Sequence, residues 1–163
     1  MVVWTLRNAR RSDLPVLQSF WHQMMDLHRE LDARFRFDAD VDRDVKRHLL
    51  EAIGSRHALV LVAEVEGQVV GYTLGWLHER RPIYPAGRYG FISDLFVMPI
   101  WRRQGIGRGL VAGMLEWFAK RDVTDIELFV AEANAGAQAF WQAMGFEPFL
   151  RLMRRPIRRE TTP

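Results

Sequence analysis

The sequence contains no cysteine, and this absence removes several kinds of chemistry. Disulfide bonds, thiolate metal sites and a cysteine nucleophile are all excluded. No apolar run approaches the roughly 20 residues of a membrane-spanning helix, and the first residues lack the basic start and apolar stretch of a signal peptide. The five histidines show no ligand spacing such as His-x-x-x-His, so we expect no metal site. We therefore expect a cytoplasmic protein with no membrane partner.

The composition is that of an ordinary globular chain. Of the 163 residues, 48% are hydrophobic and 26% are charged, which suffices for one domain with a core of its own. We assign residues 1–157 to this domain and residues 158–163 to a short basic tail. The net charge of +3 includes five arginines between residues 151 and 159. We interpret them as part of a solvated chain end rather than a nucleic-acid surface, because no nucleic-acid-binding module accompanies them.

The hydrophobic pattern predicts the element order β-α-α-β-β-β-α-β-α-β. The expected fold class is therefore α/β (α+β), with a mixed, mostly antiparallel sheet flanked by helices. The expected strands are residues 2–6, 57–65, 69–77, 89–97, 125–130 and a last strand from residue 146. The expected helices are residues 14–27, 41–53, a segment through residues 110–118, and residues 134–144.

A glycine-rich basic turn lies between the strand that ends at Val97 and the helix that contains Leu110. Glycine exposes backbone N–H groups there, and the first N–H groups of a helix have no internal partner and carry the positive end of its dipole. Such a turn binds phosphate groups well. No Gly-Lys-Ser/Thr follows, so it is not a P-loop, and a dinucleotide fingerprint would need its third glycine at Leu110. Three arginines, at positions 102, 103 and 108, add positive charge.

Two sequence motifs occur in the second half of the chain, and we interpret them together because of their order and spacing. The first is Arg102-Arg-Gln-Gly-Ile-Gly107, preceded by the strand Leu95-Phe-Val-Met-Pro99. The second is Asn134-Ala-Gly-Ala-Gln-Ala-Phe-Trp-Gln-Ala-Met-Gly-Phe146. They resemble the Gln/Arg-x-x-Gly-x-Gly/Ala and Asn-x-x-Ala-x-x-Phe-Tyr-x-x-x-Gly-Phe signatures of the GNAT superfamily of acetyl-CoA-dependent N-acetyltransferases. The resemblance is specific for residues 91–146, whereas the first third of the chain matches only in element order.

The resemblance implies acetyl-CoA as cosubstrate and a sheet whose fourth and fifth strands splay apart around the pantetheine arm. It implies that the backbone of residues 103–108 holds the pyrophosphate and that residues 95–97 pair with the arm as if it were an added strand. The Val97 N–H would polarise the thioester carbonyl, and Asn134 would hydrogen-bond the cosubstrate. The implied cofactor-binding residues are Leu95, Phe96, Val97, Arg102, Arg103, Gln104, Gly105, Ile106, Gly107, Arg108 and Asn134.

The chain departs from the family at the residue expected to protonate the departing thiolate. The family often has a tyrosine there, whereas this chain has Trp141, whose indole N–H cannot deliver a proton at useful cost. We expect Trp141 to be a packed helix residue. The best-placed candidates for the base are Asp94 and its neighbour Ser93, which replaces an acid found in the resembled diamine acetyltransferases. Asp94 can equally be a structural carboxylate.

The sequence does not identify the acceptor, because two charged segments favour acceptors of opposite charge. Aspartates crowd residues 32–44, which would attract a cationic amine, or would simply belong to a solvated loop. Arginines in residues 78–88 would instead favour an acceptor with a carboxylate or phosphate. The sequence is compatible with either a small-molecule amine or a protein amine as acceptor. It also leaves open an acyl group longer than acetyl, and a homodimer. A non-catalytic acyl-CoA-binding module of the same fold is the alternative function.

Overall fold

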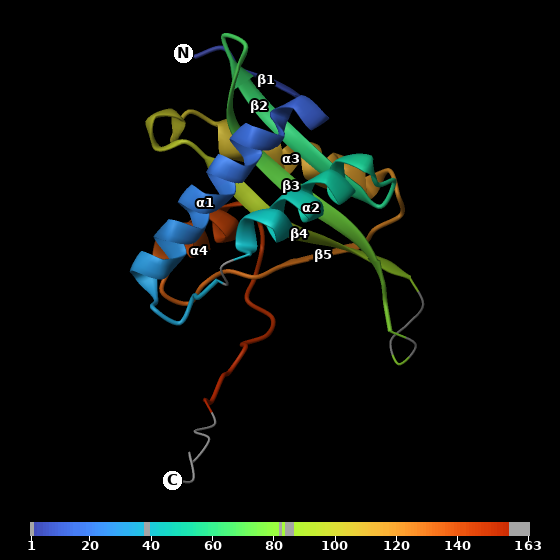
Figure 1. Ribbon diagram of the computed structural model, residues 1–163. Helices are drawn as coiled ribbons and strands as arrows, with labels where there is room; N and C mark the ends of the chain where they lie inside the picture. Colours follow the sequence, from blue (N-terminus) through green and yellow to red (C-terminus); the bar gives the residue numbers. More distant parts are fainter. Residues whose placement is uncertain (1, 38–39, 82, 84–86, 157–163) are drawn as a thin grey trace.

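The computed structural model describes residues 2–37, 40–81, 83 and 87–156, and in this part of the chain a five-stranded sheet has the order β1-β2-β3-β4-β5 (Figure 1). The strands are β1 (Thr5–Asn8), β2 (Ala58–Val65), β3 (Gln68–Glu79), β4 (Arg88–Val97) and β5 (Asp125–Leu128). Neighbours from β1 to β4 pair antiparallel, and β4 and β5 run parallel. The predicted single α/β domain with a mixed sheet is confirmed.

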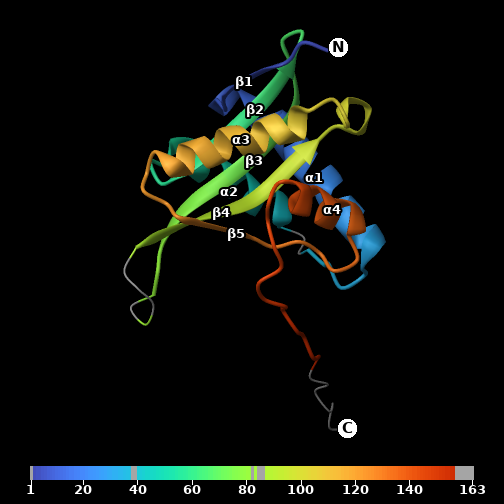
Figure 2. The ribbon, with the colours of Figure 1, turned by 180° about the vertical axis from the view of Figure 1, so that it is seen from behind.

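Helices cover both faces of the sheet (Figures 1 and 2). One face carries α1 (Leu14–Leu31) and α2 (Val41–Gly54), and the other carries α3 (Ile106–Ala119), which is the crossover between the parallel strands β4 and β5. The short helix α4 (Ala135–Ala143) follows β5, and single 3-10 turns lie at Arg11–Asp13 and Pro99–Trp101. Within the described ranges, no helix combines the length and apolar character that a membrane crossing demands.

Each face of the sheet has its own core, because strand side chains alternate in direction. Under α1 and α2, the residues Leu17, Phe20 and Leu49 pack on Val62 and Tyr72. On the opposite face, the buried stripe of α3 packs on the other side of the same strands. The stripe consists of Ile106, Leu110, Val111, Met114 and Phe118.

A glycine on β4 allows α3 to approach the sheet closely. A Cβ atom at Gly90 would lie 2.7 Å from the ring of Phe118, which is closer than any real contact. The ring therefore occupies the volume that a side chain would need. This contact fixes the close approach of the C-terminal part of α3 to β4.

The largest differences from the predicted elements concern β1, α1 and the last strand. Strand β1 is shifted to Thr5–Asn8, where it pairs with residues 61–64 of β2, and α1 continues one turn further to Leu31. The last strand, predicted from residue 146, is wrong for residues 146–156, none of which is in a strand. Pro148 provides no N–H for a ladder, and this segment leaves the body of the protein instead of following β5 (Figure 1). Residues 157–163, which include the proposed tail, lie outside the described residues.

Candidate active site

Strands β4 and β5 separate halfway along β4. Their parallel pairing covers Tyr89–Ile92 of β4 and ends at Leu128 of β5, whereas β4 continues to Val97 beside β3 alone. Figure 2 shows the chain that follows β5 turning away from β4 beyond this point. The gap is the splay that the family resemblance predicted.

The end of β4 directs backbone groups into this gap. The Met98 N–H donates to the Val70 carbonyl of β3 over 2.9 Å. Because backbone groups alternate along an antiparallel strand, the N–H groups of Val97 and Leu95 point away from β3 and toward the gap. The backbone groups of Phe96 face β3. The carbonyl of Val97 accepts a hydrogen bond from Arg102 Nε at 2.9 Å, so one side chain ties the turn to the end of the strand.

A β-bulge lies next to this strand end. Leu74 of β3 pairs with Asp94, but the next residue, Gly75, pairs with Ile92, so Ser93 is the extra residue. Ser93 is exposed, and its hydroxyl donates to the Leu74 carbonyl at 3.4 Å. A bulge bends its strand and redirects the side chains beside it. No local pattern in the sequence indicates this bulge.

The turn before α3 has the conformation of an anion cradle. Gly105, the N-cap of α3, has φ of +84°, and Arg103 has φ of +64°. The Gly109 N–H donates to the Gly105 carbonyl, which is the first bond inside the helix. The N–H groups of Ile106, Gly107 and Arg108 therefore have no partner within α3 and point out of its N-terminus.

The side chains of the turn differ in exposure. Ile106 is buried in the core beneath the turn, so only its backbone faces outward. Arg102, Arg103, Gln104 and Arg108 are exposed. A Cβ atom built on Gly107 would lie 3.5 Å from the Phe140 ring of α4, which is an ordinary contact. Helix α4 therefore packs directly against the turn.

Asn134 is the N-cap residue of α4. Its Oδ1 accepts the Ala137 N–H at 3.0 Å, which caps the helix. The side-chain amide has donors of its own in addition to this acceptor. Trp141, in the last turn of α4, is buried, and its ring centroid lies 5.2 Å from that of Phe140 and 5.1 Å from that of Phe146. The expectation that Trp141 is a packed helix residue is confirmed.

Asp94 lies on the face of β4 that α1 and α2 cover, and it is buried among aromatic rings. Only 8% of its surface is exposed, and the Tyr72 hydroxyl donates to its carboxylate at 3.2 Å. Burial raises the pKa of Asp94 to about 6, and the hydrogen bond from Tyr72 opposes this rise. Burial and the nearby carboxylate raise the pKa of Tyr72 well above its usual 10. The ring of Phe20 stacks on that of Phe96, 4.9 Å away, beside this pair.

The charged segments around the site are largely neutralised by their neighbours. Asp40 pairs with Arg43, Asp44 with Arg47, and Asp42 lies 2.7 Å from a ring nitrogen of His22. Asp38 lies outside the described residues. Of the arginines expected near an acceptor, Arg80 binds Asp125 and Glu127 at 2.8 and 3.6 Å. Neither charge pattern is therefore a simple electrostatic signal for the acceptor.

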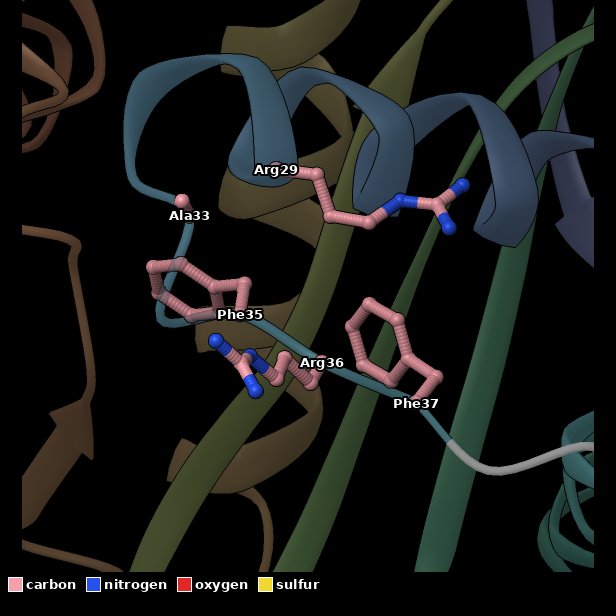
Figure 3. A pocket seen from close by; sticks show the side chains of 5 residues that line it. All are labelled: Arg29, Ala33, Phe35, Arg36 and Phe37. Atoms are coloured by element: carbon pink, nitrogen blue, oxygen red, sulfur yellow. The ribbon is translucent and has the colours of Figure 1, made fainter.

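The sequence interpretation missed a surface hollow of about 460 Å³ at the end of α1. It is lined by Arg29, Ala33, Phe35, Arg36 and Phe37 (Figure 3). The Arg29 guanidinium lies over the Phe37 ring, 6.0 Å from its centroid, and this ring contacts Trp21 edge-on. Because α1 covers the face of the sheet that carries Asp94, the hollow opens on that same side. These residues lie in an irregular segment with no periodicity that could have indicated a site.

Comparison with known proteins identifies the chain. A model of the acetyltransferase (GNAT) family matches residues 21–146. The chain belongs to this family. This GNAT chain is 30% identical over 135 residues to an uncharacterized N-acetyltransferase of Archaeoglobus fulgidus, covering 81% of this chain and 87% of that protein.

Solved structures agree on the fold. The tetramutant of the BH1408 protein from Bacillus halodurans matches with a TM-score of 0.84 at 22% identity, covering 94% of this chain and 99% of that one. The aminoglycoside N-acetyltransferase AAC(6')-Iy in complex with CoA matches with a TM-score of 0.74 at 18% identity, covering 97% of each chain. At these identities the likeness concerns the GNAT fold alone.

Proposed function

We propose that this GNAT protein transfers an acetyl group from acetyl-CoA to a primary amine, by direct attack of the amine in a ternary complex. One observation carries the proposal: the Val97 N–H faces a gap between two strands, the helix N–H groups of the turn before α3 follow the end of the same strand, and the buried carboxylate of Asp94 lies three residues earlier on it. Phosphate binding, carbonyl polarisation and proton acceptance each need one of these features.

Acetyl-CoA would bind along the turn and the end of β4. The N–H groups of residues 103–108 would hold the pyrophosphate, with the exposed arginines of the turn adding charge. The backbone of Leu95 and Val97 would pair with the pantetheine arm, in the place that β5 leaves open. Phe96 would contribute its position in the strand rather than its backbone groups, because these face β3. The complex of AAC(6')-Iy with CoA, on the same fold, supports this cosubstrate.

In the proposed reaction, a C–N bond forms between the amine and the acetyl carbon while the C–S bond to CoA breaks. The Val97 N–H would stabilise the negative charge that develops on the acetyl oxygen. Asp94, with a pKa of about 6, is mostly ionised at pH 7 and would accept the proton that the amine loses. Ser93, exposed at the bulge, would assist through its hydroxyl. The departing thiolate would take its proton from water, because Trp141 is packed in the core.

The acceptor would enter on the face of the sheet that carries Asp94 and α1. The hollow beside Phe35 and Phe37 lies on the α1 side of the sheet. In this proposal it receives a small-molecule amine or the end of a peptide chain. AAC(6')-Iy is by name an enzyme of a small-molecule amine, which supports the first. A cytoplasmic location is part of this proposal and rests on composition alone.

The decisive experiment is a calorimetric titration of acetyl-CoA into the wild type and Gly107→Asp, followed by an assay of free thiol across a panel of amines and peptides. We expect the wild type to bind, the variant to lose binding, and thiol to appear with one class of amine. A wild type that does not bind acetyl-CoA would refute the proposal.

The alternative is an acyl-CoA-binding module without catalysis. Two observations favour it: Trp141 replaces the family's acidic tyrosine, and the hydroxyl of Tyr72 is already bonded to Asp94. Tyr84 lies outside the described residues. Binding of acetyl-CoA with no thiol release on a broad panel would support this alternative. Titration of longer acyl-CoA esters in the same assay would identify the preferred acyl group.

A further inference from the structure

A threonine in the middle of β3 is fully buried on the side of the sheet that α3 covers. Thr73 exposes none of its surface, and it alternates with Tyr72 and Leu74, which pack under α1 and α2. A valine has nearly the same shape and would need no hydrogen bond there, whereas a buried hydroxyl without a partner is costly. The hydroxyl of Thr73 has such a partner, because it donates to the backbone carbonyl of Asp94 at 2.8 Å.

This hydrogen bond ends at the bulge of β4. Asp94 pairs with Leu74 of β3, and the extra residue Ser93 comes directly before it. A bulge interrupts the regular ladder, so the backbone there is held by fewer regular bonds than elsewhere in the sheet. Two hydroxyls add bonds at this point: Thr73 donates to β4, and Ser93 donates to the Leu74 carbonyl of β3 at 3.4 Å. The bond from Thr73 is the shorter one, and it is buried, whereas Ser93 is exposed.

The bulge determines on which face of the sheet Asp94 lies. In a regular strand, residues two or four apart point to the same face. Ile92 packs in the core under α3, whereas Phe96, four residues later, packs in the core under α1 and α2. The strand therefore turns over at the extra residue, and the Asp94 carboxylate lies beside Tyr72. Without the bulge, residue 94 would share the face of Ile92 and point toward α3.

We infer that Thr73 is a positioning residue for the proposed acetyl transfer. Its hydroxyl holds the bulge, and through the bulge it holds the Asp94 carboxylate beside the Tyr72 hydroxyl, where the carboxylate would accept the proton of the amine. Thr73 itself contacts neither substrate, because its side chain is enclosed in the core on the α3 side. The inference rests on the proposed function, in which Asp94 is the base.

Two substitutions separate the hydroxyl of Thr73 from its shape, because Thr73→Val keeps the shape and Thr73→Ser keeps the hydroxyl. Without the bond, the Asp94 carboxylate relaxes toward water. Its pKa should therefore fall from about 6 toward the usual 3.8 in Thr73→Val, and stay near 6 in Thr73→Ser. Within the described ranges, Tyr72 is the titratable residue that acts on Asp94, and its hydrogen bond lowers the pKa. An NMR titration of isotope-labelled aspartate carboxyls, in which the Asp94 signal is assigned by its absence from Asp94→Asn, measures this pKa without any enzymatic activity.

Kinetics test whether Thr73 acts through Asp94. Thr73→Val should lower the kcat of thiol release about 10- to 100-fold, a part of the roughly 10²–10⁴-fold that a general base contributes, and should leave the affinity for acetyl-CoA unchanged. In the background of Asp94→Asn, the same substitution should have no further effect on kcat, because the group that Thr73 positions is gone. Val65→Ala is the control: it opens a cavity at the far end of β2, so it should lower stability and leave kcat and the Asp94 pKa as in the wild type.

The two measurements distinguish failure of this inference from failure of the proposed function. An Asp94 pKa that is the same in the wild type and in Thr73→Val would overturn the positioning role, whatever the activity. Equal losses of kcat in Thr73→Val and Thr73→Ser, or losses that add to that of Asp94→Asn, would mean that Thr73 serves the core alone. A wild type that releases no thiol with any amine would refute acetyl transfer, whereas a lowered pKa in Thr73→Val would still establish that Thr73 holds Asp94. If circular dichroism shows that Thr73→Val is unfolded, Thr73→Ala, which also lacks the hydroxyl, replaces it in both measurements.

Discussion

The hydroxyl of Tyr72 donates a hydrogen bond of 3.2 Å to the carboxylate of Asp94. The two residues lie on the neighbouring strands β3 and β4, on the face of the sheet under α1 and α2. This bond favours the ionised carboxylate and lowers its pKa, whereas burial raises it. Burial is the larger effect, so Asp94 titrates near pH 6, within the range where a proton acceptor for an amine is useful. The pair gives the proposed mechanism a pH dependence that can be measured.

Removal of the hydroxyl should move this pH dependence. In Tyr72→Phe the ionised form of Asp94 loses its donor, so its pKa should rise above about 6. The acidic limb of the rate of thiol release should shift to higher pH by the same amount. Tyr89→Phe is the control, because Tyr89 lies on the far half of β4 beside Arg80, and its profile should match the wild type. An unshifted limb in Tyr72→Phe would remove Asp94 from the role of base.

Asp94→Asn should affect stability and activity in opposite directions. The folded pKa of Asp94 is raised, so the folded state binds the proton more tightly than the unfolded state does. The resulting stability is complete below about pH 4 and is lost as the pH rises through about 6. A shift of this size corresponds to on the order of 2–3 kcal/mol. Asparagine does not titrate in this range, so the free energy of unfolding of the variant, measured with urea, should rise relative to that of the wild type between pH 4 and pH 7. Its acetyl transfer should fall. An equal difference between the two proteins at both pH values would contradict the raised pKa.

Two substitutions at Gly107 separate charge from bulk in the cradle. Gly107→Ala places a Cβ in ordinary contact with Phe140, and should retain the fold and most of the affinity for acetyl-CoA. Gly107→Asp adds a carboxylate where the pyrophosphate is proposed to bind, and should abolish binding. Calorimetry reports both. At Gly105, which has φ of +84°, even alanine should cost about 1 kcal/mol of stability, because side chains other than glycine strain that conformation.

Asn134 can be tested in both of its tasks. Asn134→Ala removes the cap of α4 and the proposed donor to the cosubstrate, so we expect a loss of about 1 kcal/mol in stability and roughly 1–2 kcal/mol in binding of acetyl-CoA. Asn134→Asp keeps an acceptor for the Ala137 N–H but has no amide donor. It should unfold like the wild type and bind acetyl-CoA weakly. Wild-type affinity in Asn134→Asp would show that Asn134 serves the helix alone.

The sequence predicted the parts of this fold that depend on local pattern. The apolar stripes of α1 and α3 consist of residues three or four apart, and the structure has them at the predicted positions. The glycine turn before Ile106 is likewise a local feature of the sequence, and it is found there. Asn134 was predicted at the start of a helix and is its N-cap. Such features need no knowledge of what packs against them.

The features that the sequence did not predict depend on distant partners. Tyr72 and Asp94 meet only because β3 and β4 pair in one register, and that register includes the bulge at Ser93, which no local signal marks. The last strand was predicted from residue 146 onward, but whether a segment joins a sheet depends on where the chain leads it relative to a distant strand, and residues 146–156 lead away from β5. Likewise, the aspartates at the start of α2 resemble a free acidic surface in the sequence, whereas in the structure they pair with arginines such as Arg43 and Arg47.

The hydrogen bond from Arg102 to the Val97 carbonyl holds the turn before α3 at a set distance from the end of β4. It joins the turn that is proposed to bind the phosphates to the strand end that would receive the thioester, so the protein rather than the flexible cosubstrate sets the distance between these two points. An analogue of acetyl-CoA with one methylene more in its pantetheine arm should therefore be held at the phosphates as before, while its reactive carbon overshoots Val97. Discrimination against such an analogue would appear in the rate of transfer and not in the affinity.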